Sequence, residues 1–341
     1  MTSSIILRWF HPFIDAFRAR NIPFHYRWRL LLLQPIAILS YLINTVPTIF
    51  SYRSSVIHIP VRNGRRIRSL VYYPPAAPDG SGQERRPLHL DIHGGGFIGG
   101  CPEAGHRFCA QVANQTGAIV VSTTYRFAPK DLFPAAIDDV DDVVAWLLKN
   151  AAERFQADPK MFTISGSSAG GNLALATAIR DDYRQIVRGV ITFYASIDLT
   201  LPPERKPRPP NYPTKDPIFF LVPLFDAYAG PVRSEHIDNP RLSPAKAPAD
   251  LLPNKILMVV PTIDILLAEQ LQFAKRVNQE LEDEGKPGKV EAMIMEKCFH
   301  GWLELPSSVI EEKTRTQVFE RSIKFLQSIY KQDDQRILSK E

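Results

Sequence analysis

The chain is poor in cysteine, and the cysteines that it has do not pair by spacing. Its 341 residues include Cys101, Cys109 and Cys298, an odd number without a C-x-x-C spacing. A disulfide framework or a structural zinc site needs closely spaced pairs of such residues. We therefore interpret the three cysteines as buried or incidental thiols, and we expect neither a metal nor a cofactor.

Long blocks of a single charge are also missing. The 41 Lys and Arg residues and the 36 Asp and Glu residues leave a formal net charge of +5, spread without a long basic block. Nucleic-acid binding would require a concentrated basic patch, so we expect no nucleic-acid partner. The apolar content of 45% is ordinary for a globular protein with a hydrophobic core.

An uncharged run near the N-terminus allows two interpretations. Residues 30–52 contain no charge and are preceded by Arg27 and Arg29. The run is long enough to span a bilayer, which predicts membrane association through residues 30–52. Alternatively, residues 1–52 form two short helices, broken at Pro35 and Pro47, that lay apolar faces over a pocket. We expect an intracellular protein, either cytoplasmic or associated with the endoplasmic-reticulum membrane.

Strands and helices alternate through residues 53–341, which predicts one domain with a mostly parallel, doubly wound sheet and helices on both faces. The first two strands form an antiparallel hairpin that turns at Asn63 and Gly64. The expected strands are 54–60, 67–73, 88–92, 118–123, 161–165, 189–194, 255–260 and 290–295. The expected helices are 103–116, 136–149, 173–179, 266–284 and 309–330.

A proline-rich interval interrupts this alternation. Nine prolines lie in residues 201–231, among aromatic residues that include Phe219 and Phe220. We interpret residues 200–240 as an insertion over the carboxyl ends of the strands, where open α/β sheets bind ligands. We expect Phe219, Phe220 and also Phe97 to line a substrate pocket.

Ser168 stands at the apex of a G-x-S-x-G turn between a strand and a helix. Gly166 and Gly170 allow the strained backbone and close strand–helix contact of a nucleophile elbow. The first N–H groups of the next helix then point to the place where an anion forms. The sequence therefore predicts Ser168 as a nucleophile.

A serine nucleophile needs a base, and the base needs an acid that orients it. His300 follows the last predicted strand on a short loop and is our general base. The acid must follow a strand and precede the histidine, which fits Asp264 and also Asp198. We prefer Asp264, which comes four residues after the apolar run 256–260. The resulting order Ser, Asp, His is the one expected of an α/β-hydrolase sheet, and Asp198 is its main competitor.

Three consecutive glycines follow the strand at residues 88–92, in the segment His93-Gly94-Gly95-Gly96-Phe97. Glycines at a strand end expose backbone N–H groups, as an oxyanion hole requires. With the N–H of Ala169, these groups would stabilise a tetrahedral intermediate. We interpret His93 as a residue that shapes this loop.

The motifs together resemble the hormone-sensitive-lipase-like carboxylesterases, the α/β-hydrolase fold-3 group. Besides the glycine loop and the serine turn, residues 125–130 read Y-R-F-A-P-K and residues 133–136 read F-P-A-A. These resemble the family's Y-R-L-A-P-E and F-P-A-A segments in order and spacing. The chain departs in having Ser167 where the family commonly has Asp or Thr.

The resemblance implies an α/β-hydrolase fold over 53–341, with a cap built from the N-terminal segment and the insertion. It implies Ser168 as nucleophile, Asp264 as acid and His300 as base. Its oxyanion donors correspond to three residues, Gly95, Gly96 and Ala169. We expect a serine carboxylesterase acting on a small apolar ester of short or moderate acyl length. The alternatives are an acyltransferase or lactone hydrolase in natural-product metabolism, and a non-catalytic binding protein.

Overall fold

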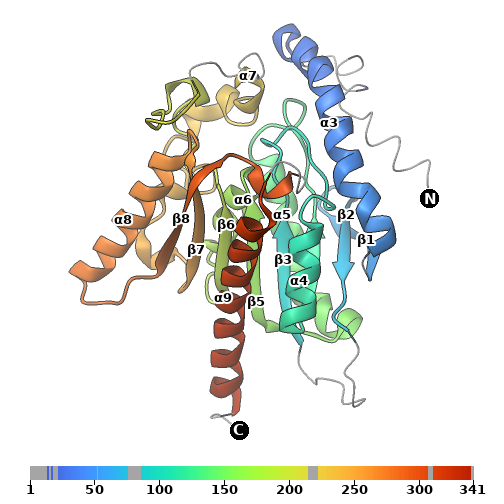
Figure 1. Cartoon of the computed structure of the whole chain (residues 1–341), viewed down its shortest axis with the longest axis vertical. Helices are drawn as coiled ribbons and strands as arrows, with labels where there is room; N and C mark the ends of the chain where they lie inside the picture. The colour runs from blue at the N-terminus through green and yellow to red at the C-terminus, as the bar shows by residue number, and fades with distance from the viewer. Residues whose placement is uncertain are drawn as a thin grey trace.

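Among the residues that the structure describes, eight strands form one sheet (Figure 1). The computed structural model describes residues 22–51, 53–75, 86–213, 222–305 and 310–338, together with Ile14 and Phe17. The strands are β1 (Ser54–Val61), β2 (Arg65–Tyr72), β3 (Arg86–Ile92), β4 (Ile119–Thr123), β5 (Ala157–Ser167), β6 (Val187–Phe193), β7 (Ile256–Ile263) and β8 (Val290–Phe299). Their order is β1-β2-β4-β3-β5-β6-β7-β8. β2 pairs antiparallel with both β1 and β4, and the other neighbouring strands pair in parallel.

Helices cover both faces of this sheet. One face packs against α5 (Ala135–Phe155), α6 (Ala169–Ala178) and α8 (Leu267–Asp283), and the other against α4 (His106–Thr116) and α9 (Glu312–Leu338). Each face has its own hydrophobic core: the first core lies under α5, α6 and α8, and the second core lies under α4 and α9. Alternate strand residues point to opposite faces, so Met258 of β7 joins the first core and its neighbour Val259 joins the second. The predicted doubly wound sheet is confirmed.

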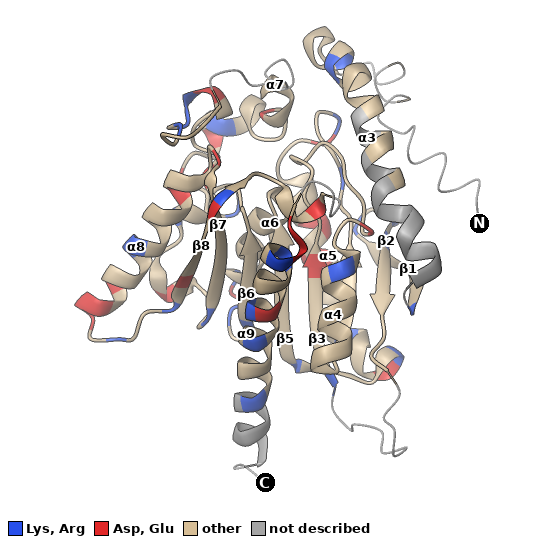
Figure 2. Ribbon diagram, viewed as in Figure 1, with Lys and Arg blue, Asp and Glu red and all other residues tan. Residues whose placement is uncertain are grey.

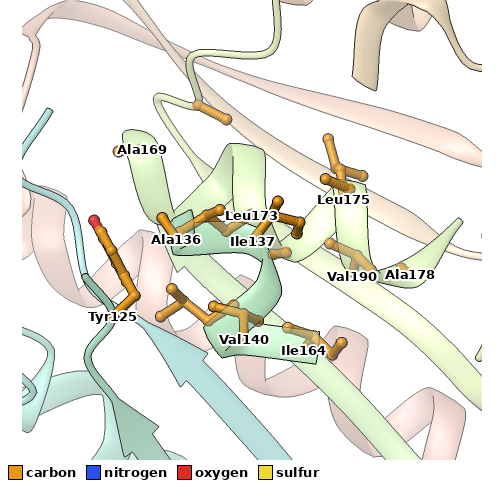
Figure 3. Packing of buried hydrophobic residues seen from close by; sticks show 14 of the residues in the cluster. Tyr125, Ala136, Ile137, Val140, Ile164, Ala169, Leu173, Leu175, Ala178 and Val190 are labelled. Atoms are coloured by element: carbon orange, nitrogen blue, oxygen red, sulfur yellow. The ribbon is translucent and has the colours of Figure 1, made fainter. Parts of the chain in front are cut away.

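The first core fixes the helix that begins at the nucleophile turn. Figure 3 shows Ile137 and Val140 of α5 beside Leu173 of α6 and Ile164 of β5. All four side chains are fully buried. Burial of such side chains contributes about 1.5–3 kcal/mol each. The packing therefore holds α6 firmly on the sheet directly behind Ser168.

The hairpin of β1 and β2 also matches the prediction. Its strands pair antiparallel from Ser54 with Tyr72 to Val61 with Arg65. Asn63 and Gly64 form the turn, with left-handed φ angles of 63° and 68°. Asparagine and glycine tolerate this conformation better than other residues.

The N-terminal helix α3 (Phe24–Ser51) corrects one expectation. We expected two short helices broken at Pro35 and Pro47, but a single helix runs through both prolines. A proline inside a helix removes one backbone hydrogen bond and costs about 3 kcal/mol. Here the buried side chains of Leu30 and Gln34 hold the turn that precedes Pro35, and the helix resumes after it. Across the described residues, no helix combines the length and the apolar character that crossing a membrane takes.

The described part of the predicted insertion consists of short helical turns near the upper end of α3 (Figure 1). They are η1 (Pro203–Arg205), α7 (Val222–Phe225) and η3 (Gly230–Glu235), and η4 (Pro244–Lys246) and η5 (Ala249–Leu251) follow them. α7 contacts α3, so two segments that are far apart in the sequence meet here. The expected pocket residues Phe219 and Phe220 lie outside the described residues.

Candidate active site

Ser168 occupies the sharp turn between β5 and α6 in a strained backbone conformation. Its φ of 52° and ψ of −117° are rare for a residue with a side chain. A Cβ atom on Gly170 would lie 2.0 Å from the carbonyl oxygen of Ile92 at the end of β3, so only glycine fits there. Since α6 begins directly after Ser168, the positive end of the helix dipole is next to the serine.

Two hydrogen bonds join Ser168, His300 and Asp264. Oγ of Ser168 lies 2.8 Å from Nε2 of His300, and Nδ1 of His300 lies 2.8 Å from Oδ2 of Asp264. The register of β7 and β8 explains the second contact, because Ile263 pairs with Phe299 and each is followed by one of the two residues. The structure thus brings together the three side chains that the sequence singled out.

The charge of Asp264 governs the protonation of His300. Burial disfavours the imidazolium, but the charge and hydrogen bond of Asp264 outweigh burial, so the pKa of His300 is raised. The carboxylate of Asp198, the competing acid, has a different partner, because its Oδ1 accepts hydrogen bonds from the N–H and hydroxyl of Thr200. Within the described ranges, no group of three or more His, Cys, Asp and Glu side chains is arranged to hold a metal ion.

The glycine loop after β3 lies beside Ser168. Gly95 and Gly96 have φ angles of 118° and 60°, and a Cβ atom on Gly95 would lie 2.3 Å from the carbonyl oxygen of Gly99. The backbone there is therefore open only to glycine. Gly95, Gly96 and Ala169 line the same cavity as Ser168, which is the placement that an oxyanion hole requires.

His93 holds this loop in place through the two nitrogens of its ring. Its Nδ1 lies 2.6 Å from the carbonyl oxygen of Gly94, and its Nε2 lies 2.8 Å from Oγ1 of Thr124. Burial lowers the pKa of His93 to about 4, so the ring is neutral at pH 7. A neutral ring with both nitrogens engaged suits the role in loop shape that the sequence suggested.

A cavity of about 1070 Å³ is lined by the triad, the glycine loop, α3 and the insertion. Its apolar side chains include Trp28, Leu33, Leu199, Leu201, Val222 and Phe225. Phe97 also lines the cavity, and its buried ring stacks on that of Tyr228 with 4.2 Å between centroids. The cavity therefore offers a large, mainly apolar space directly above the serine.

A buried ion pair ties the insertion to the helix that follows Asp264. Nζ of Lys206 lies 2.5 Å from Oε2 of Glu269, and both side chains are nearly inaccessible to solvent. Oε1 of Glu269 accepts the N–H groups of Ile197 and Asp198. Burial raises the pKa of Glu269 to about 7 against the opposing charge of Lys206. The pair fixes the position of the cavity wall relative to the acid.

Sequence reasoning missed two residues of the site. Tyr194 directly follows β6, and its ring packs edge-on against the imidazole of His300 with 5.2 Å between centroids. Its hydroxyl donates to Oε1 of Glu304 at 3.4 Å. Tyr194 could have been found from its place at a strand end, whereas Glu304, four residues after His300, carries no motif that marks it.

Comparison with known proteins covers the region that holds the site. A family model described as the alpha/beta hydrolase fold matches residues 89–304. Esterase LipI of Mycobacterium tuberculosis is 38% identical over 114 residues, which are 33% of this chain and 34% of LipI. Versiconal hemiacetal acetate esterase of Aspergillus parasiticus is 35% identical over 138 residues, 40% of each chain. The chain spans about a third of the length of the curated relatives that it matches.

A solved structure extends the similarity to the fold. The hyperthermophilic esterase from the archaeon Pyrobaculum calidifontis superposes with a TM-score of 0.72 and 26% identity. The match covers 89% of this chain and 94% of that one. The α/β-hydrolase fold predicted from the sequence is therefore confirmed.

Proposed function

Because this chain belongs to the hormone-sensitive-lipase-like group of the alpha/beta hydrolase fold, we propose that it is a serine carboxylesterase. Its substrate is a small-molecule apolar ester, and Ser168 carries the acyl group during the reaction. The observation that supports this most strongly is the pair of 2.8 Å hydrogen bonds from Ser168 through His300 to Asp264. These three residues line a mainly apolar cavity, together with the glycine loop.

In the first half-reaction, Oγ of Ser168 attacks the ester carbonyl carbon while its proton passes to Nε2 of His300. Backbone N–H groups of Gly95, Gly96 and Ala169 stabilise the resulting oxyanion. The tetrahedral intermediate collapses, the C–O bond to the alcohol breaks, and His300 returns the proton to the departing alkoxide. Asp264 keeps the imidazolium oriented. Water then repeats the sequence on the acyl-serine and releases the acid.

The cavity supports an ester with a bulky apolar part. Drug-sized ligands occupy pockets of roughly 300–1,000 Å³, and this cavity of about 1070 Å³ is slightly larger than that range. A short or moderate acyl group would fill only a fraction of it. We therefore assign the larger part of the space to the alcohol portion of the ester.

The size of the cavity also favours acyl acceptors other than water, because an alcohol or amine could enter beside the acyl-serine. Acyl transfer and lactone opening use the same residues as ester hydrolysis. In acyl transfer an alcohol or amine, in place of water, attacks the acyl carbon of the acyl-serine. In lactone opening Ser168 attacks the carbonyl carbon of a cyclic ester. Product analysis with and without a competing alcohol distinguishes transfer from hydrolysis. A ring-opened product from a lactone panel would identify the lactone hydrolase.

The test of the serine is the substitution Ser168→Ala, assayed with p-nitrophenyl butyrate. Turnover should be lost while thermal unfolding stays as in the wild type. Labelling by a fluorophosphonate probe should occur in the wild type and not in the variant. Retention of most activity by Ser168→Ala would refute the assignment, and an unlabelled wild-type serine would favour a binding protein.

We also propose that α3 and the insertion at about 200–240 form a cap over the site. Leu33 of α3 and Phe225 of α7 line the cavity above the glycine loop. The ring of Phe225 is so close that a Cβ atom on Gly96 would lie 2.7 Å from its Cδ1 atom. A cap at this contact would exclude water from the reacting carbonyl.

The outer side of α3 supports association with a lipid surface. Phe24, Leu32, Leu39 and Leu42 are 79%, 50%, 58% and 39% exposed, and 3.6 residues per turn places them within about 80° around the helix. Residues 1–51 contain five Arg and one Asp, a net charge of +4, and Figure 2 shows no acidic residue on the described part of α3. An apolar stripe flanked by arginine suits an anionic membrane surface.

Sedimentation with vesicles tests this association. The wild type should pellet with vesicles in which phosphatidylserine makes up a fifth of the lipid. The variant with Leu32→Glu and Leu39→Glu should remain in the supernatant. Both proteins should hydrolyse p-nitrophenyl butyrate equally in vesicle-free buffer. Equal pelleting of the two proteins would refute a role for the stripe.

A further inference from the structure

Glu304 is a carboxylate beside the nucleophile that the triad does not use. It ends η6 (Trp302–Glu304), the short turn after His300. Its Oε1 accepts the hydroxyl of Tyr194, and a Cβ atom built on Gly94 would lie 3.3 Å from Cβ of Ser168 and 3.6 Å from this Oε1. The carboxylate and the nucleophile therefore border the same small space next to the glycine loop.

The backbone on both sides of Glu304 is fixed. The buried guanidinium of Arg315 in α9 donates to the carbonyl oxygens of Leu303 and Leu305, the two neighbours of Glu304. Trp302 is fully buried in the second core. A side chain held between two anchored residues keeps its direction without reorganisation, as a group that acts in a reaction should.

Glu304 also lies between two cavities. It lines the large cavity above Ser168 and a second one of about 200 Å³, and Tyr194 and Ala104 line both as well. The polar groups Asp91 and Ser167 contribute to the small cavity. A water molecule occupies about 30 Å³ in the liquid, so the small cavity has room for several.

We propose that Glu304 positions the water that cleaves the acyl-serine, and that the small cavity supplies this water. The inference rests on the proposed esterase function. In this step the water oxygen bonds to the acyl carbon and one of its protons passes to Nε2 of His300. Its other O–H donates to the carboxylate of Glu304. The bond from the acyl carbon to Oγ of Ser168 then breaks, and His300 protonates Oγ.

An alternative role for Glu304 is to stabilise the charge on His300. Burial raises the pKa of Glu304, and the positive charge of His300 opposes that rise, so the two groups do interact. The imidazolium forms in both half-reactions, however, whereas water enters only in the second. The two roles therefore predict different kinetics.

The test uses the full chain with Glu304→Gln and Glu304→Leu, and p-nitrophenyl butyrate as substrate. Release of p-nitrophenol with enzyme in excess gives the acylation rate, and steady turnover gives deacylation, both scaled to sites titrated with a fluorophosphonate. A hydrogen bond to a charged group contributes enough that its loss should slow deacylation roughly 10- to 100-fold. Acylation should change less than about 3-fold, the scale of a weak neutral contact.

Methanol provides an internal control. Methanol has a single O–H, which goes to His300, so its attack needs no bond to Glu304. The ratio of hydrolysis to methanolysis should therefore fall by the same factor as deacylation in the Glu304 variants. The exposed Glu311→Gln variant, seven residues further along the chain, should keep the wild-type ratio.

The outcomes separate this inference from the proposed function. Equal slowing of acylation and deacylation, or an unchanged ratio of hydrolysis to methanolysis, overturns the role of Glu304 while leaving the esterase intact. Absence of both p-nitrophenol release and fluorophosphonate labelling in the wild type overturns the proposed function itself.

Discussion

Replacing Asp264 by asparagine should change which nitrogen of His300 carries the proton. Oδ1 of Asp264 accepts the N–H of Leu266 at 3.0 Å, and Oδ2 faces Nδ1 of His300 at 2.8 Å. In the Asp264→Asn variant the carbonyl oxygen keeps the N–H of Leu266, so the NH₂ group turns toward Nδ1. Nδ1 then accepts, the ring proton moves to Nε2, and Nε2 has no lone pair left for the proton of Ser168.

The expected loss of kcat is large because the hydrogen bond from Nδ1 of His300 to Asp264 sets the tautomer of the ring. The Asp264 side chain has 0% exposure, so solvent does not reach its carboxylate. A forced tautomer of this kind lowers kcat by about 10,000-fold, which corresponds to roughly 5.5 kcal/mol in the barrier. The substitution keeps the size of the side chain and one of its hydrogen bonds, so the fold should survive.

The assay is kcat for p-nitrophenyl butyrate at pH 7.5, with thermal unfolding measured on the same samples. The matched control is Asp198→Asn, which alters the other carboxylate that follows a strand. The side-chain hydrogen bonds of Asp198 go to Thr200, so the kcat of this variant should stay within about 3-fold of wild type, as for the loss of a weak hydrogen bond. An Asp264→Asn variant with more than a tenth of wild-type kcat would refute the tautomer argument.

Three further predictions follow from the same structure. The pKa of His300 is raised above its usual 6.5, and the base must be neutral to accept the proton of Ser168. kcat/KM should therefore fall as the pH is lowered, with a midpoint above pH 6.5. A midpoint below pH 6.5 would contradict the raised pKa. Gly95→Ala forces the loop away from Gly99 and should raise the barrier by about 3 kcal/mol through loss of an oxyanion donor, while Gly64→Ala, at a turn with open space, should leave kcat unchanged. Lys206→Met leaves Glu269 buried and unpaired, which should destabilise the fold by about 3–5 kcal/mol where Glu269 is charged. Since burial raises the pKa of Glu269 to about 7, urea unfolding should show a larger loss at pH 8 than at pH 6, and an equal loss at both contradicts the ion-pair argument.

The sheet and the positions of the three main site residues could be predicted because they depend on short-range patterns. Alternating strands and helices give parallel strands, and parallel strands place their carboxyl ends at one edge. The pairing of Ile92 with Gly166 shows the consequence, since the glycine loop and the serine turn leave neighbouring strands at the same height. No information beyond local sequence was needed for that step.

The N-terminal helix could not be predicted in the same way. Proline at 35 and 47 argues locally for two helices, and the local argument ignores the packing of Leu30 and Gln34 against the body of the molecule. Tertiary burial outweighed the lost hydrogen bonds. The same reason hides Glu304, whose role depends on what α9 and β6 place around it.

The direction of the chain after β8 brings His300 to Ser168. β5 and β8 are three strands apart in the sheet, about 14 Å at the usual spacing, and yet Oγ of Ser168 lies 2.8 Å from Nε2 of His300. The chain must therefore run back across the ends of β6 and β7, as Figure 1 shows for the segment that leads to α9. Gly301, with a φ of 76°, permits the reversal. Arg315 secures it through two carbonyl oxygens, so the contact between base and nucleophile depends on a helix that contributes no catalytic group.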